Sequence, residues 1–266
     1  MPPHYVVHRG GAALWPENSL TAFRNSLALG ARILELDVHL TADGEVAVIH
    51  DPTLERTTDG RGPIAHCTAA ELKRARLRDA SGALTDDCVP LLDEVLALAR
   101  PTGVTLLVEV KTPGPAVRYE RRGDRVVAAP GARYDGLEQR VLGLLEAGGL
   151  AQRSFIMAFN PAVLREIRTL APRQPTALLV DREHVVESGA RTTEPVQWAL
   201  EARASFLGLH HTLCDAGLME AARRAGIAVG VFTVNDEDAM RRLAGFGVDV
   251  IISDRADLVA RLQAEA

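Results

Sequence analysis

The stretch Ile33-Leu34-Glu35-Leu36-Asp37-Val38-His39-Leu40 decides the fold class of this chain. Side chains alternate between the two faces of a β-strand, so the leucine and valine side chains share one face. Glu35, Asp37 and His39 share the other. In a barrel of parallel strands, the apolar face packs against the surrounding helices and the polar face points into the interior. The stretch therefore predicts a barrel strand that carries acidic groups inward.

The same alternation returns at Thr105–Lys111, where Glu109 and Lys111 lie opposite the apolar face. Along the whole chain, short apolar runs of strand length alternate strictly with amphipathic runs of helix length. Strands are expected at Tyr5–His8, Ile33–Leu40, Thr105–Lys111, Ser154–Phe159, Thr176–Val180, Ser205–His210, Ala228–Val234 and Asp249–Ser253. Helices are expected at Ser19–Leu29, Leu92–Arg100, Leu137–Ala147, Pro161–Leu170, Pro195–Ala202, Ala216–Ala225, Asp236–Ala244 and Ala256–Ala264. This order predicts parallel βαβ units, and eight such units predict an α/β fold of the (β/α)₈ barrel (TIM barrel) class. The competing doubly wound sheet usually has about five to seven strands, and no glycine-rich dinucleotide fingerprint follows the first strand.

Two stretches interrupt this rhythm within one expected domain, residues 1–266. Thr41–Gly44 indicates a turn and Glu45–His50 a returning strand, after which residues 51–90 form a small insertion. Residues 112–135 are rich in Gly, Pro and Arg and exceed ordinary βα loops, so we expect a lid or a mobile loop. Both extra stretches follow the carboxyl ends of strands, which is the face on which barrel active sites are built.

The composition limits the classes of function. Lys and Arg number 30 and Asp and Glu 35, so the formal net charge of −5 argues against nucleic acid or an anionic membrane as the main partner. Three cysteines do not indicate a disulfide framework. No apolar run approaches the roughly 18 residues of a membrane span, and the first residues lack the pattern of a signal peptide. We therefore expect a cytoplasmic protein without a membrane span.

Four charged residues, Glu35, Asp37, Glu109 and Lys111, are expected to converge at the barrel mouth. A pair of carboxylates about 4 Å apart repels by roughly 4 kcal/mol at an effective dielectric constant of about 20. One lysine cannot cancel three negative charges, whereas a hard divalent cation with oxygen ligands, Mg²⁺ or Ca²⁺, would remove the repulsion. Zn²⁺ is disfavoured because the site offers few nitrogen and no sulfur ligands. The alternative is a buried ion-pair network around Lys111 alone.

Two histidines are expected beside this cluster. If Thr41–Gly44 is a tight turn, residues whose numbers sum to about 87 face each other, which places His50 opposite Asp37. His8 ends the first strand, which neighbours the second strand in any barrel. Two histidines beside a bound cation suit acid–base catalysis near neutral pH. Arg9 follows His8, and we expect its guanidinium to donate paired hydrogen bonds to an anionic group.

Five further residues have two interpretations each. Asn18 either caps the first helix or, like Glu17, orients a metal ligand or a phosphate. His39 points inward and belongs either to the layer behind the metal ligands or to the core. His210 ends the sixth strand and either reaches the barrel mouth or lies in an accessible loop. Phe159 either lines the pocket or packs in the core.

Several short motifs follow one another in a fixed order along the chain. They are His8-Arg9-Gly10, Pro16–Ser19, Glu35–Val38, Thr41–Gly44, His50-Asp51, Arg56–Thr58 with Gly60, Val108–Lys111, Phe232–Asn235 and Gly247–Asp254. Each motif is weak alone, but the ordered set spans nearly the whole chain and resembles the glycerophosphodiester phosphodiesterases.

The resemblance implies a (β/α)₈ barrel with a small insertion, here residues 51–90. It also implies hydrolysis of glycerophosphodiesters, such as glycerophosphocholine or glycerophosphoethanolamine, to glycerol 3-phosphate and an alcohol. The matching functional positions are the metal-binding carboxylates Glu35, Asp37 and Glu109, the acid–base pair His8 and His50, and the phosphate contacts Arg9 and Lys111.

Two departures from the family pattern bear on the substrate. Phe232 stands where the family often has Trp or Tyr, which keeps an apolar wall for the substrate but removes a polar tip. The stretch Arg118–Arg133 is longer and more basic than usual, and its arginines either meet an anionic substrate or form a solvated loop. Two other functions stay open: a lysophospholipase D acting on lysophospholipids, and a non-catalytic barrel that binds a phosphorylated ligand. The oligomeric state stays open as well.

Overall fold

The computed structural model describes residues 2–265, and its centre is a closed barrel of parallel strands. In neighbour order the strands are β1 (His4–Val7), β2 (Ile33–Leu40), β6 (Thr105–Val110), β9 (Ser154–Ala158), β10 (Thr176–Val180), β11 (Phe206–His210), β12 (Ala228–Phe232) and β13 (Val250–Ser253). Pairing of β1 with both β2 and β13 closes the barrel. The predicted (β/α)₈ class is confirmed, with strand limits within two residues of those expected.

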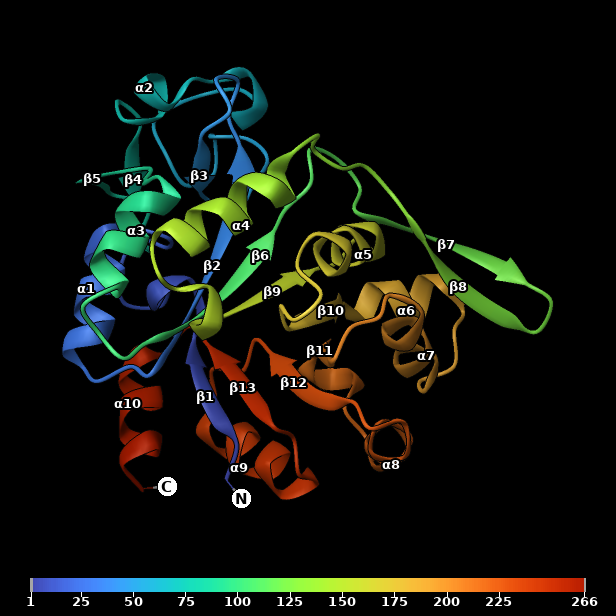
Figure 1. Ribbon diagram of the computed structural model, residues 1–266. Coiled ribbons are helices and arrows are strands. Elements are labelled where there is room, and N and C mark those ends of the chain that lie inside the picture. Colours follow the sequence, from blue (N-terminus) through green and yellow to red (C-terminus); the bar gives the residue numbers. More distant parts are fainter. Residues whose placement is uncertain (1, 266) are drawn as a thin grey trace.

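Helices cover the outside of the barrel (Figure 1). They are α1 (Leu20–Ala28), α3 (Leu92–Ala99), α4 (Leu137–Ala147), α5 (Pro161–Leu170), α7 (Glu194–Glu201), α8 (Ala216–Ala225), α9 (Glu237–Phe246) and α10 (Ala256–Glu265). Each corresponds to an expected helix. One more helix, α6 (Arg182–Ser188), follows β10 where the sequence predicted none.

One apolar layer joins strands to helices. Leu34, Leu36 and Val38 of β2 belong to the same buried cluster as Phe23 of α1 and Leu92 of α3. Burial of each such side chain stabilises the fold by about 1.5–3 kcal/mol. Because this layer uses the outward faces of the strands, the inward faces are free to carry polar groups at the carboxyl ends.

The hairpin after β2 has a different register from the predicted one. Its second strand, β3 (Val46–Val48), pairs antiparallel with β2, with Val38 opposite Val48. The Thr41 N–H donates to the Glu45 carbonyl, so the turn holds three residues between its closing pair. Residue numbers therefore sum to 86 across the ladder, and the prediction that His50 lies opposite Asp37 is wrong by one position.

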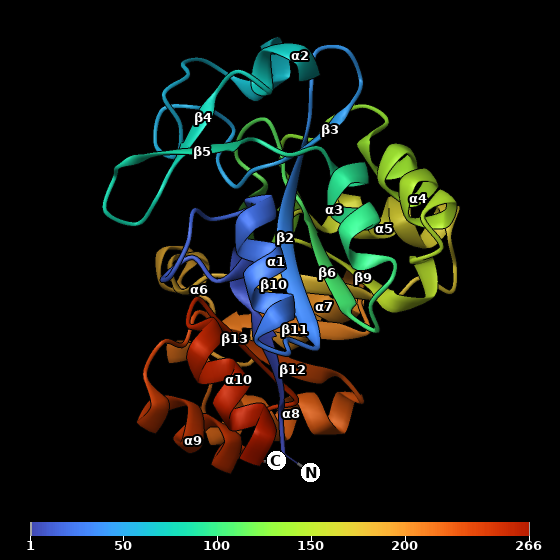
Figure 2. The same cartoon turned by 90° about the vertical axis from the view of Figure 1, so that its left-hand side faces the viewer.

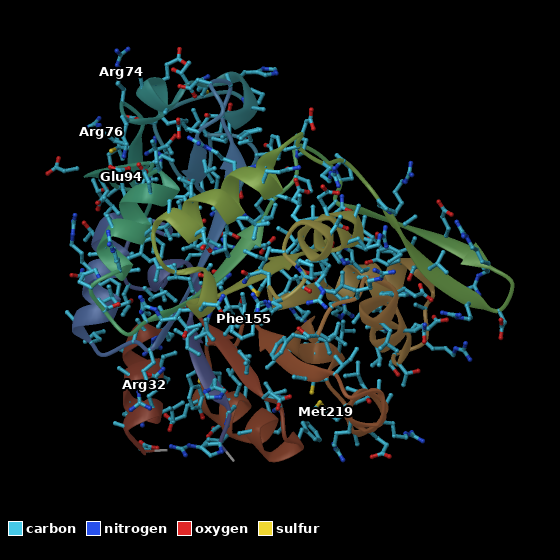
Figure 3. The ribbon with its side chains drawn as sticks, viewed as in Figure 1. Arg32, Arg74, Arg76, Glu94, Phe155 and Met219 are labelled. Atoms are coloured by element: carbon cyan, nitrogen blue, oxygen red, sulfur yellow. The ribbon has the colours of Figure 1, made fainter. Side chains whose placement is uncertain are left out.

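The insertion forms a small unit of its own at the carboxyl ends of the barrel strands. It contains a single-turn 3₁₀ helix at Ile64–His66, α2 (Ala69–Leu72), β4 (Arg76–Arg78) and β5 (Leu84–Cys88). Its buried residues form a separate apolar cluster that includes Ile49, Leu54 and Leu77. Figure 2 shows this unit at the end of the barrel opposite both chain termini. Figure 3 shows Arg74 and Arg76 at its outer edge.

The basic stretch at 112–135 contains an ordered hairpin. Strands β7 (Val117–Arg122) and β8 (Arg125–Pro130) pair antiparallel and project from the barrel in Figure 1. Trp198 of α7 anchors the hairpin, since its indole N–H donates to the Val126 carbonyl at 2.7 Å and its ring lies 4.8 Å from that of Tyr119. The sequence pattern predicted no strands in this stretch, so the hairpin is an addition to the predicted elements.

Candidate active site

Inward-facing side chains at the carboxyl ends of the barrel strands meet in one cavity of about 310 Å³. Most of the residues singled out in the sequence line it or lie directly behind its wall. The lining includes His8, Arg9, Glu35, His50, Glu109, Lys111, Phe159, Asp181, His210 and Phe232. Asp37 and Asn18 are buried immediately behind these residues, and Glu17 contacts Arg9. The structure thus brings together residues from almost every barrel strand.

Three buried carboxylates form the acidic centre of the cavity. Glu35, Asp37 and Glu109 each offer an oxygen within 4.8 Å of the others, and they are 1%, 0% and 6% exposed. Burial raises the pKa of Glu35 well above its usual range, and the charges of Asp37 and Glu109 raise it further. At neutral pH this cluster therefore needs a compensating positive charge.

Lys111 supplies only part of that charge. Its ammonium lies 3.0 Å from Asp37 Oδ1 and 2.5 Å from Glu109 Oε1. Burial alone would raise the pKa of Asp37, but Lys111 and Arg9 hold it well below the usual range. Asp37 Oδ1 is nonetheless buried without a hydrogen bond. Three buried carboxylates whose oxygens lie within 4.8 Å of one another, with a single ammonium beside two of them, fit a hard divalent cation.

The loop after β1 places His8 and Arg9 at the cavity. Arg9 has φ 50° and Gly10 φ 74°, and a Cβ on Gly10 would approach the Ala22 Cβ to 2.9 Å. Only glycine fits this left-handed position against α1. The Arg9 N–H donates to Glu35 Oε2 at 3.0 Å, which fixes the turn over the acidic cluster.

His8 is oriented by a carboxylate. Its Nδ1 lies 2.6 Å from Asp254 Oδ1, and the Asn235 amide donates to the other Asp254 oxygen at 2.7 Å. Burial raises the pKa of Asp254, but the hydrogen bonds with His8 and Asn235 and the positive charge of Arg9 together hold it below its usual value. The other ring nitrogen of His8, Nε2, lies 3.8 Å from Glu35 Oε2, directly beside the acidic cluster.

His50 has a matching arrangement on the other side of the cluster. Its Nδ1 lies 2.6 Å from Asp51 Oδ1. Arg56 binds Asp51 through Nε at 2.6 Å and Nη2 at 2.9 Å, and it donates two further hydrogen bonds to Glu17. The hydrogen bond from His50 and those from Arg56 hold the pKa of Asp51 far below its usual range. Asp51 thus stays ionised and keeps the His50 ring in one orientation.

His39 lies behind His50 and is almost fully buried. Burial lowers the pKa of His39 to about 4, so its ring is neutral at pH 7. His39 Nε2 lies 3.0 Å from the His50 carbonyl, which can only accept, so Nε2 carries the proton. His39 Nδ1 then accepts from the Tyr134 hydroxyl at 2.9 Å. His39 is thus a buried residue that contacts Tyr134 and the backbone of His50.

Asn18 and Glu17 support the cluster without capping the first helix. Ser19 is the cap of α1, since its hydroxyl accepts from the Ala22 N–H. Asn18 has φ 58°, and its amide donates to Asp37 Oδ2 at 2.8 Å. The cap interpretation of Asn18 is therefore wrong, because the chain turns into the helix one residue later. Glu17 accepts from Arg9 Nη1 at 3.1 Å.

Four further residues belong to the site but were not selected from the sequence. Asp51 and Asp254 orient the histidines, Arg56 binds Asp51, and Asp181 lines the cavity at the end of β10. The sequence did contain a signal for Asp254, since it directly follows the last expected strand, which must close against the first. Asp181 shows the same strand-end signal.

Known proteins resemble this chain in sequence and structure. Residues 8–258 match the family model of the glycerophosphoryl diester phosphodiesterase family. A glycerophosphodiester phosphodiesterase of Caldanaerobacter subterraneus subsp. tengcongensis is 29% identical over 258 residues, covering 97% of this chain and 96% of that protein. The crystal structure of a putative glycerophosphoryl diester phosphodiesterase from Agrobacterium tumefaciens has TM-score 0.84 and 28% identity, covering 100% of this chain and 98% of that chain. A phosphodiesterase from Oleispira antarctica, solved in complex with the product sn-glycerol-3-phosphate, shares the fold with TM-score 0.76 at 24% identity, covering 99% of this chain and 96% of that chain.

Fold and cavity together define a hydrolase built on a (β/α)₈ barrel. Because the family model covers nearly the whole chain, the chain belongs to the glycerophosphoryl diester phosphodiesterase family and is a phosphoric diester hydrolase that acts on glycerophosphodiesters. The resemblance seen in the sequence is thereby confirmed. Within residues 2–265, none of the helices has the length and apolar character needed to cross a membrane.

Proposed function

We propose that this enzyme hydrolyses glycerophosphodiesters such as glycerophosphocholine or glycerophosphoethanolamine to glycerol 3-phosphate and the free alcohol. One observation carries the proposal. Two histidines, each bound through Nδ1 to an aspartate at 2.6 Å, line the same cavity as Glu35, Glu109 and two cationic side chains, and Asp37 completes the acidic cluster directly behind them. This set can bind a phosphate, activate a nucleophile and protonate a leaving oxygen.

The three carboxylates would hold one divalent cation, Mg²⁺ or Ca²⁺, through Glu35, Asp37 and Glu109. When bound, such a cation supplies positive charge at the non-bridging phosphate oxygens and so stabilises the developing negative charge of the transition state. The buried cluster, with its surplus of negative charge, supports this assignment.

Lys111 and Arg9 would bind the phosphate of the diester. Both side chains line the cavity, and both are held by carboxylates in the structure: Lys111 by Asp37 and Glu109, Arg9 by Glu17 and Asp37. Burial alone would lower the pKa of Lys111, but Asp37 and Glu109 raise it, so the ammonium keeps its proton. Arg9 adds a planar fork that suits two phosphate oxygens.

His8 and His50 would carry the protons. In each ring, Nδ1 is occupied by an aspartate, which leaves Nε2 for the substrate. One Nε2 would take a proton from the nucleophile, either water or the glycerol 2-hydroxyl. The other would give a proton to the departing alcohol oxygen. Attack by the 2-hydroxyl would produce a transient cyclic phosphate.

The test is an assay of the purified enzyme with glycerophosphocholine, glycerophosphoethanolamine and a lysophospholipid, in Mg²⁺, Ca²⁺ or chelator. We expect metal-dependent release of glycerol 3-phosphate from the first two. His8→Ala and His50→Ala should each lower kcat by about 10² or more with a smaller effect on KM. Near-normal turnover by either variant would remove that histidine from the mechanism. If the wild-type enzyme released lysophosphatidate from the lysophospholipid and hydrolysed neither of the other two diesters, the lysophospholipid would be the substrate instead.

A further inference from the structure

Asp181 lies in the cavity directly across the barrel from His8. It follows Val180, the last residue of β10, and it shares the inward face with Leu179, which also lines the cavity. In the closed sheet, β10 is four strands from β1 in both directions. A carboxylate therefore faces the proposed catalytic centre from the opposite wall.

This carboxylate differs from the others of the cavity in its partners. Asp51 and Asp254 each bind a histidine, and the three buried carboxylates lie beside Lys111 or Arg9. Asp181 takes part in no ion pair within residues 2–265. A carboxylate in a half-enclosed cavity without a cation favours a ligand that brings one.

Aromatic rings stand on both sides of Asp181 in the barrel. Phe159 directly follows β9, the preceding barrel strand, and Phe232 ends β12, the strand after next. Their ring centroids are 6.1 Å apart at an angle of 86°, and both line the cavity. The Lys111 ammonium already lies 5.9 Å from the Phe159 centroid, so this ring stands within cation–π range of a positive charge.

A groove leads from the cavity past Asp181. It encloses about 460 Å³ and shares His50, Lys111, Phe159 and Asp181 with the cavity. It continues between the foot of the β7–β8 hairpin and α6, where the exposed Glu183 lines its wall. A group leaving the phosphate beside Lys111 can thus pass a second acidic side chain before it reaches solvent.

We propose that Asp181, with Phe159 and Phe232, forms a subsite for a positively charged leaving alcohol and thereby selects diesters with an ammonium head group. The proposal rests on the proposed function. A quaternary ammonium donates no hydrogen bond, so it is recognised by negative charge and aromatic faces, which are the groups found here. A polyol head group needs several hydrogen-bonding partners, and the two phenylalanine rings of this wall offer none, which leaves His210 on β11 as the polar ring beside Asp181.

The experiment compares three diesters that share the glycerol 3-phosphate half: glycerophosphocholine, glycerophosphoethanolamine and the uncharged-head-group glycerophosphoglycerol. Asp181→Asn preserves a helix-capping residue type at the start of α6 while removing the charge. We expect kcat/KM to fall about tenfold more for the two cationic diesters than for glycerophosphoglycerol, mainly through KM. Glu187→Gln removes a charge from the same helix outside the cavity and should leave the ratio unchanged.

A second measurement needs no variant. Choline and its uncharged isostere 3,3-dimethylbutan-1-ol are compared as inhibitors of wild-type enzyme, and choline should bind more tightly. Equal inhibition by the two compounds would overturn the proposal. An equal loss on all three diesters in Asp181→Asn would also overturn it, since Asp181 would then contact the shared glycerol half. Failure of the proposed function itself would look different, because wild-type enzyme would hydrolyse none of the diesters.

Discussion

Each of the two cavity histidines is held by a short series of hydrogen bonds that passes through an aspartate. Asn235 holds Asp254, which orients His8, and Arg56 holds Asp51, which orients His50. Each chain fixes one imidazole through Nδ1 and leaves the other nitrogen free. The orientation of the two proposed catalytic histidines is therefore set by residues that need not touch the substrate.

His39 extends the series at His50 through its hydrogen bond to the His50 carbonyl, and it makes the free energy of unfolding depend on pH. Its pKa falls from about 6.5 in an unfolded chain to about 4 in the folded protein. Between these values the unfolded chain binds more protons than the folded one, so the free energy of unfolding falls as pH falls through this window. At pH 4.5 the loss attributable to His39 is about 2 kcal/mol relative to pH 7.

His39→Asn should remove that part of the pH dependence. Urea unfolding of wild type and variant at pH 7 and pH 4.5 measures it, with wild type expected to lose about 2 kcal/mol more than the variant. His66→Asn, which removes an exposed histidine of the insertion, is the matched control. An equal pH dependence in wild type and His39→Asn would show that His39 is not held neutral by the fold.

At the scale of elements, the β7–β8 hairpin is joined to the barrel by contacts with α6 and α7. Trp198 is 1% exposed, and its indole N–H satisfies the Val126 carbonyl. Only the foot of the hairpin, from Thr112 to Val117, lines the groove beside the active site. The projecting part therefore contributes to stability more than to catalysis.

Trp198→Phe should lower the free energy of unfolding by about 1–3 kcal/mol, because it leaves the Val126 carbonyl without its donor in a buried position. Urea unfolding and amide hydrogen exchange of residues 117–130 measure this, and kcat/KM should change less than about twofold. Tyr119→Phe keeps the ring contact with Trp198 and should have little effect on either quantity. A large loss of kcat/KM in Trp198→Phe with unchanged stability would place the hairpin in the catalytic site instead.

The sequence predicted those strands and helices whose residue pattern reflects burial. It did not predict features that depend on the length of a turn or on a contact with a distant residue. Alternation in Ile33–Leu40 predicted a barrel strand because its apolar side packs against helices. The register of β3 depended on whether two or three residues make the turn, which the pattern at Thr41–Gly44 does not specify. The hairpin at 117–130 was missed because its many arginines resemble a solvated loop, while the ring that covers it, Trp198, lies far along the chain.

The same contrast explains the predictions about the site. Convergence of Glu35, Asp37 and Glu109 followed from strand alternation, since neighbouring parallel strands align their carboxyl ends. The hydrogen bond between Asn18 and Asp37 did not follow, because it depends on a left-handed residue just before the helix. A hydrogen bond of this kind follows from the backbone conformation of one residue, which the sequence pattern does not specify.

In the whole molecule, the pairing of β2 with β6 inside the barrel brings three carboxylates into one buried place where their charges oppose folding. Burial and the neighbouring charges raise the pKa of Glu35 well above its usual value, so at neutral pH its ionised form destabilises the folded state. A divalent cation that binds only the folded cluster, as proposed, would reverse this effect. Stability of the enzyme and occupancy of its site are therefore linked.

Removal of the cation should accordingly lower the melting temperature. At a free Mg²⁺ or Ca²⁺ concentration about 100 times Kd, binding adds about 2.7 kcal/mol, which raises Tm by roughly 5 °C or more for a domain of this size. Calorimetry of the chelated and metal-loaded protein at pH 7 measures the shift. Glu35→Gln should abolish the shift and raise Tm in chelator, because it removes a buried charge together with a ligand. Glu187→Gln, an exposed change on α6, should keep the full shift. A full shift in Glu35→Gln would place the cation elsewhere in the molecule, and its stabilising effect would then have no connection with the acidic cluster.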